Sequence, residues 1–107
     1  MSELTLMVAN KNIAFKVFMP FVEDGAVFIP SDEKHRLGDQ VTLKINMPEL
    51  QKEIDCEGVV IWISPLGSHS KRGVGVQFQG KQGEQAKQAF ETYVAGMKMG
   101  NKKTFTL

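Results

Sequence analysis

The chain has 107 residues, which is enough for one domain around a single hydrophobic core and too few for two. Its 13 lysines and arginines nearly balance its 12 aspartates and glutamates, and 42% of the residues are hydrophobic. This composition argues against a disordered chain and against a strongly basic nucleic-acid binder. No apolar run approaches the ~20 residues of a membrane-spanning helix, and residues 1–20 lack a secretory pattern. We therefore expect a cytoplasmic protein without membrane insertion.

The first third of the chain carries signals for strands and turns. Residues 4–8 form a short apolar stretch, and the residue types at positions 10–12 favour a turn. In residues 13–19, which end at Pro20, the alternate apolar residues Ile13, Phe15, Val17 and Met19 would share one face, which predicts a strand. Gly25 then permits a tight bend before a further predicted strand over residues 26–29.

Three more strands are predicted in the middle of the chain. Residues 40–47 have the cleanest period-2 pattern, which places Val41, Leu43, Ile45 and Met47 toward the core. Residues 53–64 begin with the same alternation, but residues 58–63 are apolar on both faces and should be covered on both sides. In the last predicted strand, residues 73–78, alternate glycines allow another side chain or backbone to approach closely.

The hydrophobic period changes to three and four residues from Glu84 onward, which predicts an amphipathic helix over residues 82–98. Its apolar stripe consists of Ala86, Ala89, Phe90, Tyr93, Val94 and Met97. This stripe could cover residues 58–63, and residues 99–107 read as a flexible tail. We expect one mainly β domain over residues 1–107. It comprises a small six-stranded antiparallel β-barrel over residues 4–79 and a C-terminal helix.

The order of four segments resembles the PilZ domain family. The segments are residues 25–29 after a motif glycine, residues 41–47, residues 58–62 with Trp62, and the glycine-rich residues 73–78 before the helix. The resemblance covers most of residues 4–97. It implies a six-stranded barrel with a terminal helix.

The resemblance also implies where a nucleotide would bind. PilZ domains hold cyclic di-GMP with an R-x-x-x-R pair ahead of the barrel and with polar residues of a D/N-x-S-x-x-G motif. The only arginines here are Arg36 and Arg72, and Pro20 and Val22 stand at the two polar motif positions before Gly25. We therefore expect no bound cofactor and no direct cyclic-di-GMP binding.

Residues 19–30 resemble the pilus-assembly members of the family. That resemblance implies a non-enzymatic adaptor in type IV pilus biogenesis and twitching motility. Its implied protein partners are the extension ATPase PilB and a FimX-like cyclic-di-GMP receptor. Two alternatives stay open: a direct cyclic-di-GMP receptor with an altered pocket, and a barrel that binds single-stranded RNA, which the near-neutral charge disfavours.

Seven residues are candidates for partner binding: Met19, Pro20, Phe21, Val22, Trp62, Tyr93 and Met97. Large aromatic side chains are favoured interface anchors when exposed, but each of these residues could instead pack in the core or plug the barrel. The basic residues 68–72 could meet a phosphate or an acidic partner, or form a solvated loop. His35 and His69 lack partners at a ligand spacing, and Cys56 is the only cysteine, so we expect neither a metal site nor a catalytic residue.

Overall fold

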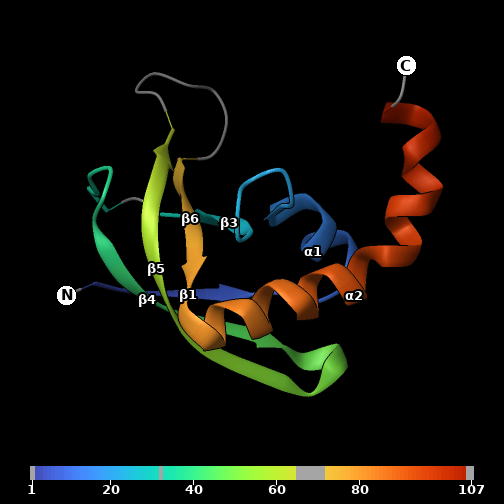
Figure 1. Cartoon of the computed structure of the whole chain (residues 1–107), viewed down its shortest axis with the longest axis horizontal. Coiled ribbons are helices and arrows are strands. Elements are labelled where there is room, and N and C mark those ends of the chain that lie inside the picture. Colours follow the sequence, from blue (N-terminus) through green and yellow to red (C-terminus); the bar gives the residue numbers. More distant parts are fainter. Residues whose placement is uncertain (1, 32, 65–71, 106–107) are drawn as a thin grey trace.

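Six strands form one curved sheet in the order β1-β4-β5-β6-β3-β2, which curls into a half-barrel with helix α2 across its open side (Figure 1). The computed structural model describes residues 2–31, 33–64 and 72–105; of Ser2 and residues 96–105 it describes only the backbone. In chain order the elements are β1 (Ser2–Met7), α1 (Lys11–Val17), β2 (Phe18–Met19), β3 (Ala26–Pro30), β4 (Gln40–Met47), the 3-10 turn η1 (Pro48–Leu50), β5 (Lys52–Ile63), β6 (Gly73–Gln79) and α2 (Gly80–Phe105). The predicted fold class, mainly β with six strands and a C-terminal helix, is confirmed.

One strand pair departs from the predicted antiparallel barrel. β1 runs parallel to β4, with Leu4 opposite Leu43, whereas the other neighbouring pairs are antiparallel. A parallel pair requires a long crossover, which α1, β2 and β3 provide between the two strands. The sheet is therefore mixed.

The strand predicted over residues 40–47 is confirmed with its orientation. Its four alternate apolar side chains, Val41, Leu43, Ile45 and Met47, are all 0% exposed. β4 and β5 form a long hairpin that curves beneath α2 in Figure 1. On the outer face of this hairpin, Thr42 lies opposite Glu57 and Lys44 opposite Asp55, as expected for a sheet with one face in water.

The strand predicted over residues 13–19 is wrong. Residues 11–17 form helix α1, and only Phe18 and Met19 are a strand. Asn10 caps the helix, because its side-chain Oδ1 accepts a hydrogen bond from the Ile13 amide at 3.0 Å. The helix buries Ala14, and the core also holds Phe18 four residues later. Ile13, Phe15 and Val17, whose alternation predicted a strand, are only partly buried and pack against this core from α1.

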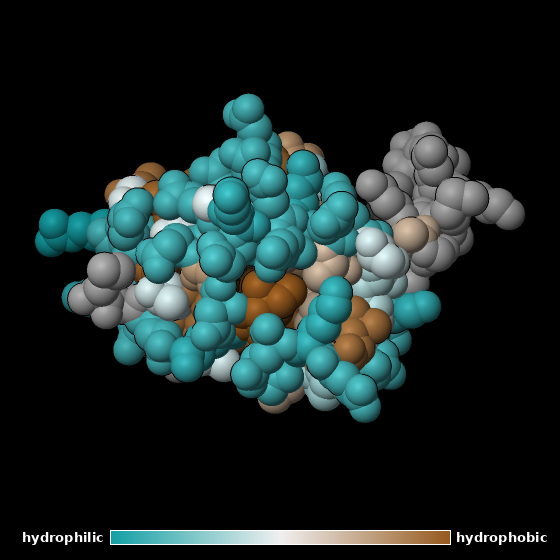
Figure 2. Space-filling model, turned by 60° about the horizontal axis from the view of Figure 1, so that its bottom comes forward, coloured by the Kyte–Doolittle hydropathy of each residue, from teal (hydrophilic) through white to brown (hydrophobic). Residues whose placement is uncertain are grey.

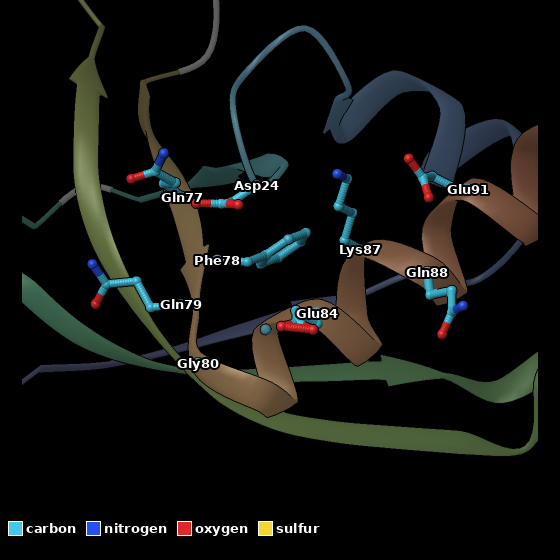
Figure 3. A pocket seen from close by; sticks show the side chains of 10 residues that line it. Asp24, Gln77, Phe78, Gln79, Gly80, Glu84, Lys87, Gln88 and Glu91 are labelled. Atoms are coloured by element: carbon cyan, nitrogen blue, oxygen red, sulfur yellow. The ribbon is translucent and has the colours of Figure 1, made fainter.

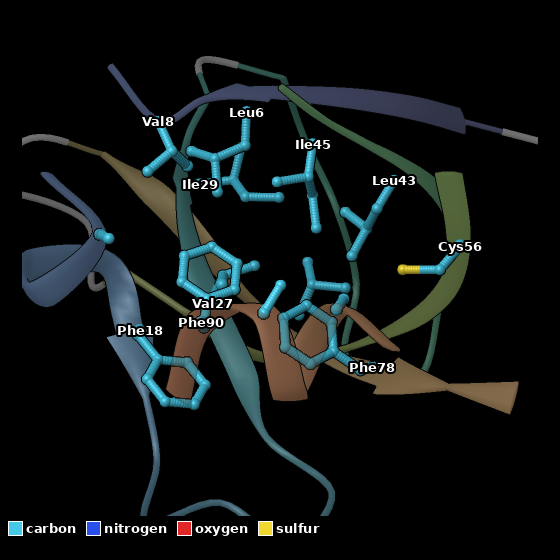
Figure 4. Close-up of a cluster of buried hydrophobic side chains, with 14 of the residues drawn as sticks. Leu6, Val8, Phe18, Val27, Ile29, Leu43, Ile45, Cys56, Phe78 and Phe90 are labelled. Atoms are coloured by element: carbon cyan, nitrogen blue, oxygen red, sulfur yellow. The ribbon is translucent and has the colours of Figure 1, made fainter. Parts of the chain in front are cut away.

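Side chains from the concave face of the sheet and from both helices meet in one core (Figure 4). Phe90 of α2 lies at its centre, with its ring centroid 5.2 Å from that of Phe18 and 6.0 Å from that of Phe78. The predicted helix stripe is buried at Ala86, Ala89, Phe90, Tyr93 and Val94. The Met97 side chain lies outside the described residues.

Helix α2 is longer than the predicted residues 82–98. It begins at Gly80, which has a φ of 75°, and continues to Phe105 through most of the stretch expected to be a tail. Its last turns extend past the sheet in Figure 1. Within residues 2–31, 33–64 and 72–105, neither helix has the length and hydropathy needed to cross a bilayer.

Candidate functional site

An apolar cluster lies on the outer face of the sheet, on the side away from α2. Phe28 of β3 and Trp62 of β5 are both registered with Gly75 of β6, so one row crosses three strands. The Phe28 and Trp62 ring centroids are 5.9 Å apart with the planes tilted by 58°. Trp62 remains 43% exposed and Phe28 is partly buried.

A bulge in β5 turns Trp62 outward. Val60 is registered with Val76 and belongs to the core, and by strict alternation Trp62 would face the core as well. The register shifts between Val60 and Trp62, with Ile61 as the extra residue, so that Trp62 pairs with Gly75 on the outer face. Residues 58–63 were expected to be covered on both sides. This expectation is wrong at Trp62, because α2 lies on the concave side alone.

The two glycines of β6 make room for the cluster. A Cβ atom at Gly75 would lie 3.2 Å from Cβ of Trp62 and 3.5 Å from Sδ of Met19. A Cβ atom at Gly73 would lie 2.5 Å from both Cζ of Phe28 and the Ile29 carbonyl oxygen. The predicted close approach of side chains and backbone at these glycines is confirmed.

Phe21 extends from a short loop that is fixed at both ends. The Val22 amide donates to the Met19 carbonyl at 3.2 Å, and the Gly25 amide donates to the Val22 carbonyl at 2.8 Å. β6 holds the loop as well, since the Gln77 side-chain amide donates to the Glu23 carbonyl at 2.8 Å. Despite this anchoring, Phe21 is 80% exposed. We call Met19, Phe21, Phe28 and Trp62 the outer patch.

The structure brings some of the predicted partner-binding residues together and separates others. Met19 and Trp62 both contact the space over Gly75, and Pro20, Phe21 and Val22 follow Met19 in the same loop. Pro20 is exposed, and Val22 is partly buried. Phe28 was not among the predicted residues. Its alternation with the core residues Val27 and Ile29 could have indicated its outward direction.

Tyr93 lies away from the outer patch. Its ring is buried against the sheet, and its hydroxyl donates a hydrogen bond to Oε1 of Glu49 in η1. Burial, the hydrogen bond to Glu49 and the negative charge of that carboxylate raise the pKa of Tyr93 to about 12. Tyr93 thus ties α2 to the end of the β4–β5 hairpin.

A polar cavity of about 680 Å³ lies between the first turns of α2, the end of β6 and Asp24 (Figure 3). Its charged lining consists of Asp24, Glu84, Lys87 and Glu91. Lys87 also packs along Gly25, where a Cβ atom would lie 3.0 Å from its Cγ. The lining includes neither Pro20 nor Val22, and it includes no arginine. The cavity therefore offers one cation and three carboxylates, a poor match for two phosphates.

Two further features concern the reactivity of the Cys56 thiol and the binding of metal ions. Burial, with help from the neighbouring Glu57 and Asp55 carboxylates, raises the pKa of the Cys56 thiol to about 11, so it is almost wholly protonated at neutral pH. Among the side chains that the structure describes, no three His, Cys, Asp or Glu residues converge as a metal site requires. The predicted basic loop falls mainly on residues 68–71, which lie outside the described residues.

Comparison with known proteins identifies a family. The family model described as PilZ domain matches residues 2–96, almost the whole described chain. None of the curated proteins compared with the chain matches it. The match spans both the outer patch and the concave core.

Proposed function

The chain belongs to the PilZ domain family, and on that premise we propose that it is a cytoplasmic, non-enzymatic adaptor in type IV pilus biogenesis and twitching motility. PilZ domains are in general non-enzymatic modules that bind cyclic di-GMP or other proteins. The proposed partners are the pilus extension ATPase PilB and a FimX-like cyclic-di-GMP receptor. Nucleotide signals would then reach this chain through a partner instead of through its own pocket.

The observation that carries the proposal is the exposed Phe21 of the outer patch, which lies at the position of the family's ligand motif. The loop that bears polar nucleotide contacts in other PilZ domains here carries Pro20 and Val22, with Phe21 between them 80% exposed. An aromatic ring on a hydrogen-bonded loop can be buried by a partner at little cost in conformational entropy. Trp62 supplies a second exposed aromatic anchor, and it shares the space over Gly75 with Met19, two residues before Phe21.

The outer patch is also suited to protein contact in its composition. A thioether, two phenyl rings and an indole offer large contact area with few rotatable bonds, and a methionine adapts its shape to a partner surface. Trp62 rests on Gly75 and against Phe28, so its ring direction is set before binding. Such preorganised aromatic side chains are typical hot spots, where truncation costs about 2 kcal/mol or more of binding free energy.

The test is the affinity of the full chain for the extension ATPase and for the FimX-like receptor encoded in the same genome. We expect Phe21→Ala and Trp62→Ala each to weaken binding to at least one of them by about 30-fold, the equivalent of ~2 kcal/mol. Met7→Ala is the matched control, because Met7 is 54% exposed, lies outside the outer patch, and is registered with Asn46, which pairs with Glu53 at the other end of β5 from Trp62. Wild-type affinity of both patch variants for both partners, with folding intact, would remove the outer patch from this proposal.

A calorimetric titration with cyclic di-GMP separates the proposal from the receptor alternative. The isolated chain is expected to show no binding at micromolar nucleotide, since the arginine pair and both polar motif positions are missing. Submicromolar binding by the isolated chain would favour a direct receptor and contradict an indirect route for the signal.

A further inference from the structure

A second candidate surface lies at the opposite end of β5 from Trp62. A groove of about 750 Å³ runs between α2, the end of the β4–β5 hairpin and the first residue of α1. Its volume falls in the range of ~300–1,000 Å³ that is usual for ligand-binding clefts. The residues lining it are Lys11, Leu50, Lys52, Glu53, Ile54, Gln85, Gln88, Ala89, Thr92 and Tyr93. None of them belongs to the outer patch, so the role of the groove does not depend on the proposed function.

The floor of the groove is apolar. Ile54 is registered with the buried Ile45, so its side chain lies on the concave face and borders the core, yet it remains partly exposed. Leu50 in η1 is also exposed in part, and Ala89 and Tyr93 close the helix side. Figure 2, in which the hairpin side of Figure 1 comes forward, shows hydrophobic areas framed by hydrophilic side chains. The groove is thus an open extension of the core.

The polar side chains that α2 contributes to the groove recur at helical spacing. Gln85, Gln88 and Thr92 follow one another at intervals of three and four residues, so they lie on one face of α2, directly beside the buried stripe. All three are exposed and uncharged. They offer hydrogen-bond donors and acceptors along the rim without adding a charge of either sign.

Two of the three charged side chains that line the groove, Lys11 and Lys52, are positive, and the third is Glu53. Lys52 is registered with the buried Met47 and therefore lies on the same face of β5 as Ile54, whereas Glu53, which also lines the groove, alternates to the opposite face. Lys11 enters from α1. Within the described part of the chain, neither lysine has an ion-pair partner, and the nearby Glu49 already accepts the hydrogen bond of Tyr93. Two unpaired lysines from separate segments therefore border an apolar floor.

From this complementarity we infer that the groove binds a short aliphatic peptide segment of a partner protein, with acidic residues flanking the aliphatic ones. The aliphatic side chains would cover Ile54 and Leu50, and the carboxylates would pair with Lys11 and Lys52. Trp62 is ten residues further along β5 than Lys52, which places the two surfaces as much as roughly 30 Å apart along the strand. Both surfaces can then be occupied at the same time.

The test uses the isotopically labelled full chain and a short synthetic peptide of leucine and glutamate residues. We expect amide chemical-shift changes centred on Ile54, Ala89 and Thr92, with the surroundings of Trp62 unchanged. The same peptide with lysine in place of glutamate should bind at least about tenfold more weakly. Equal binding of the two peptides, or shift changes centred on the outer patch, would overturn the inference.

Charge variants test the two lysines directly. Lys11→Glu combined with Lys52→Glu should weaken binding of the glutamate peptide at least about tenfold. The exposed Lys34 and Arg36, changed together to glutamate, alter the net charge equally but lie in a distant loop, and they should leave the affinity within about twofold. Both pairs are exposed, so the fold should survive. An equal loss of peptide affinity in the two double variants would mean that net charge alone weakens binding. That result would overturn the assignment of the groove.

Discussion

The two faces of the sheet differ sharply along one pair of neighbouring rows. On the concave face, Val27, Val76 and Val60 are registered across β3, β6 and β5, and all three are buried. On the outer face the next row is Phe28, Gly75 and Trp62, and Trp62 stays 43% exposed. The same strands therefore carry a fully buried core on one face and a partly exposed apolar surface on the other.

This difference separates the residues that stabilise the fold from the residues that are available for binding. The concave row is closed by α2, and its valines gain their full burial on folding. The outer row contributes less to folding, because its aromatic side chains are only partly buried. We therefore expect substitutions on the concave face to change stability, and substitutions on the outer patch to change binding.

The largest expected effect is at the centre of the core. Phe90→Ala removes a fully buried ring that stacks on both Phe18 and Phe78, and such truncations cost about 3–5 kcal/mol. The free energy of unfolding in urea measures this cost. A loss below about 1 kcal/mol would mean that α2 does not close the core as described.

Two glycine substitutions sharpen the comparison between the faces. At Gly58, on the concave face, an added Cβ would lie 2.4 Å from Cγ1 of Val76, so Gly58→Ala should cost about 1–3 kcal/mol of unfolding free energy. At Gly75, on the outer face, the closest atom is Cβ of Trp62 at 3.2 Å, so Gly75→Ala should cost less. It should instead displace Trp62 and weaken partner binding. A larger loss of unfolding free energy in Gly75→Ala than in Gly58→Ala would contradict the assignment of the faces.

The sequence predicted the concave face better than the outer one. The alternation in residues 40–47 and the three-four spacing in α2 both result from burial of one face, and the structure has both as predicted. The prediction for the α1 region was wrong, because Ile13, Phe15 and Val17 fit a strand pattern and the cap at Asn10 was read as a turn residue. The parallel pairing of β1 with β4 depends on tertiary packing, which local patterns do not encode.

The outer patch could be predicted only in part. The replacement of polar motif positions by Pro20 and Val22 indicated an apolar loop, and the glycines of β6 indicated a close approach. The direction of Trp62 depends on a one-residue bulge after Val60, and the alternation alone would have placed Trp62 in the core. The exposure of Phe21 depends on how its loop is tied to β6, a contact between residues far apart in the sequence.

A smaller, pH-dependent effect is expected at Tyr93. Its pKa is raised from about 10 to about 12 in the folded protein, so the protonated, hydrogen-bonded form stabilises the fold fully below about pH 10. This contribution is lost as the pH rises from about 10 to about 12. Tyr93→Phe should therefore be less stable than wild type at neutral pH, with the difference shrinking over that pH range. A difference that stays constant in thermal unfolding across the range would contradict the bond to Glu49.

The central claim, that the outer patch serves recognition and the concave face serves folding, is tested most directly at Phe21. Unfolding free energy and partner affinity are to be measured on the same preparation of Phe21→Ala. Because Phe21 is 80% exposed, the unfolding free energy should stay within about 0.5 kcal/mol of wild type, while affinity for the pilus ATPase or the FimX-like receptor falls about 30-fold. Unchanged affinity for both partners, or a loss of stability above about 2 kcal/mol, would contradict the claim.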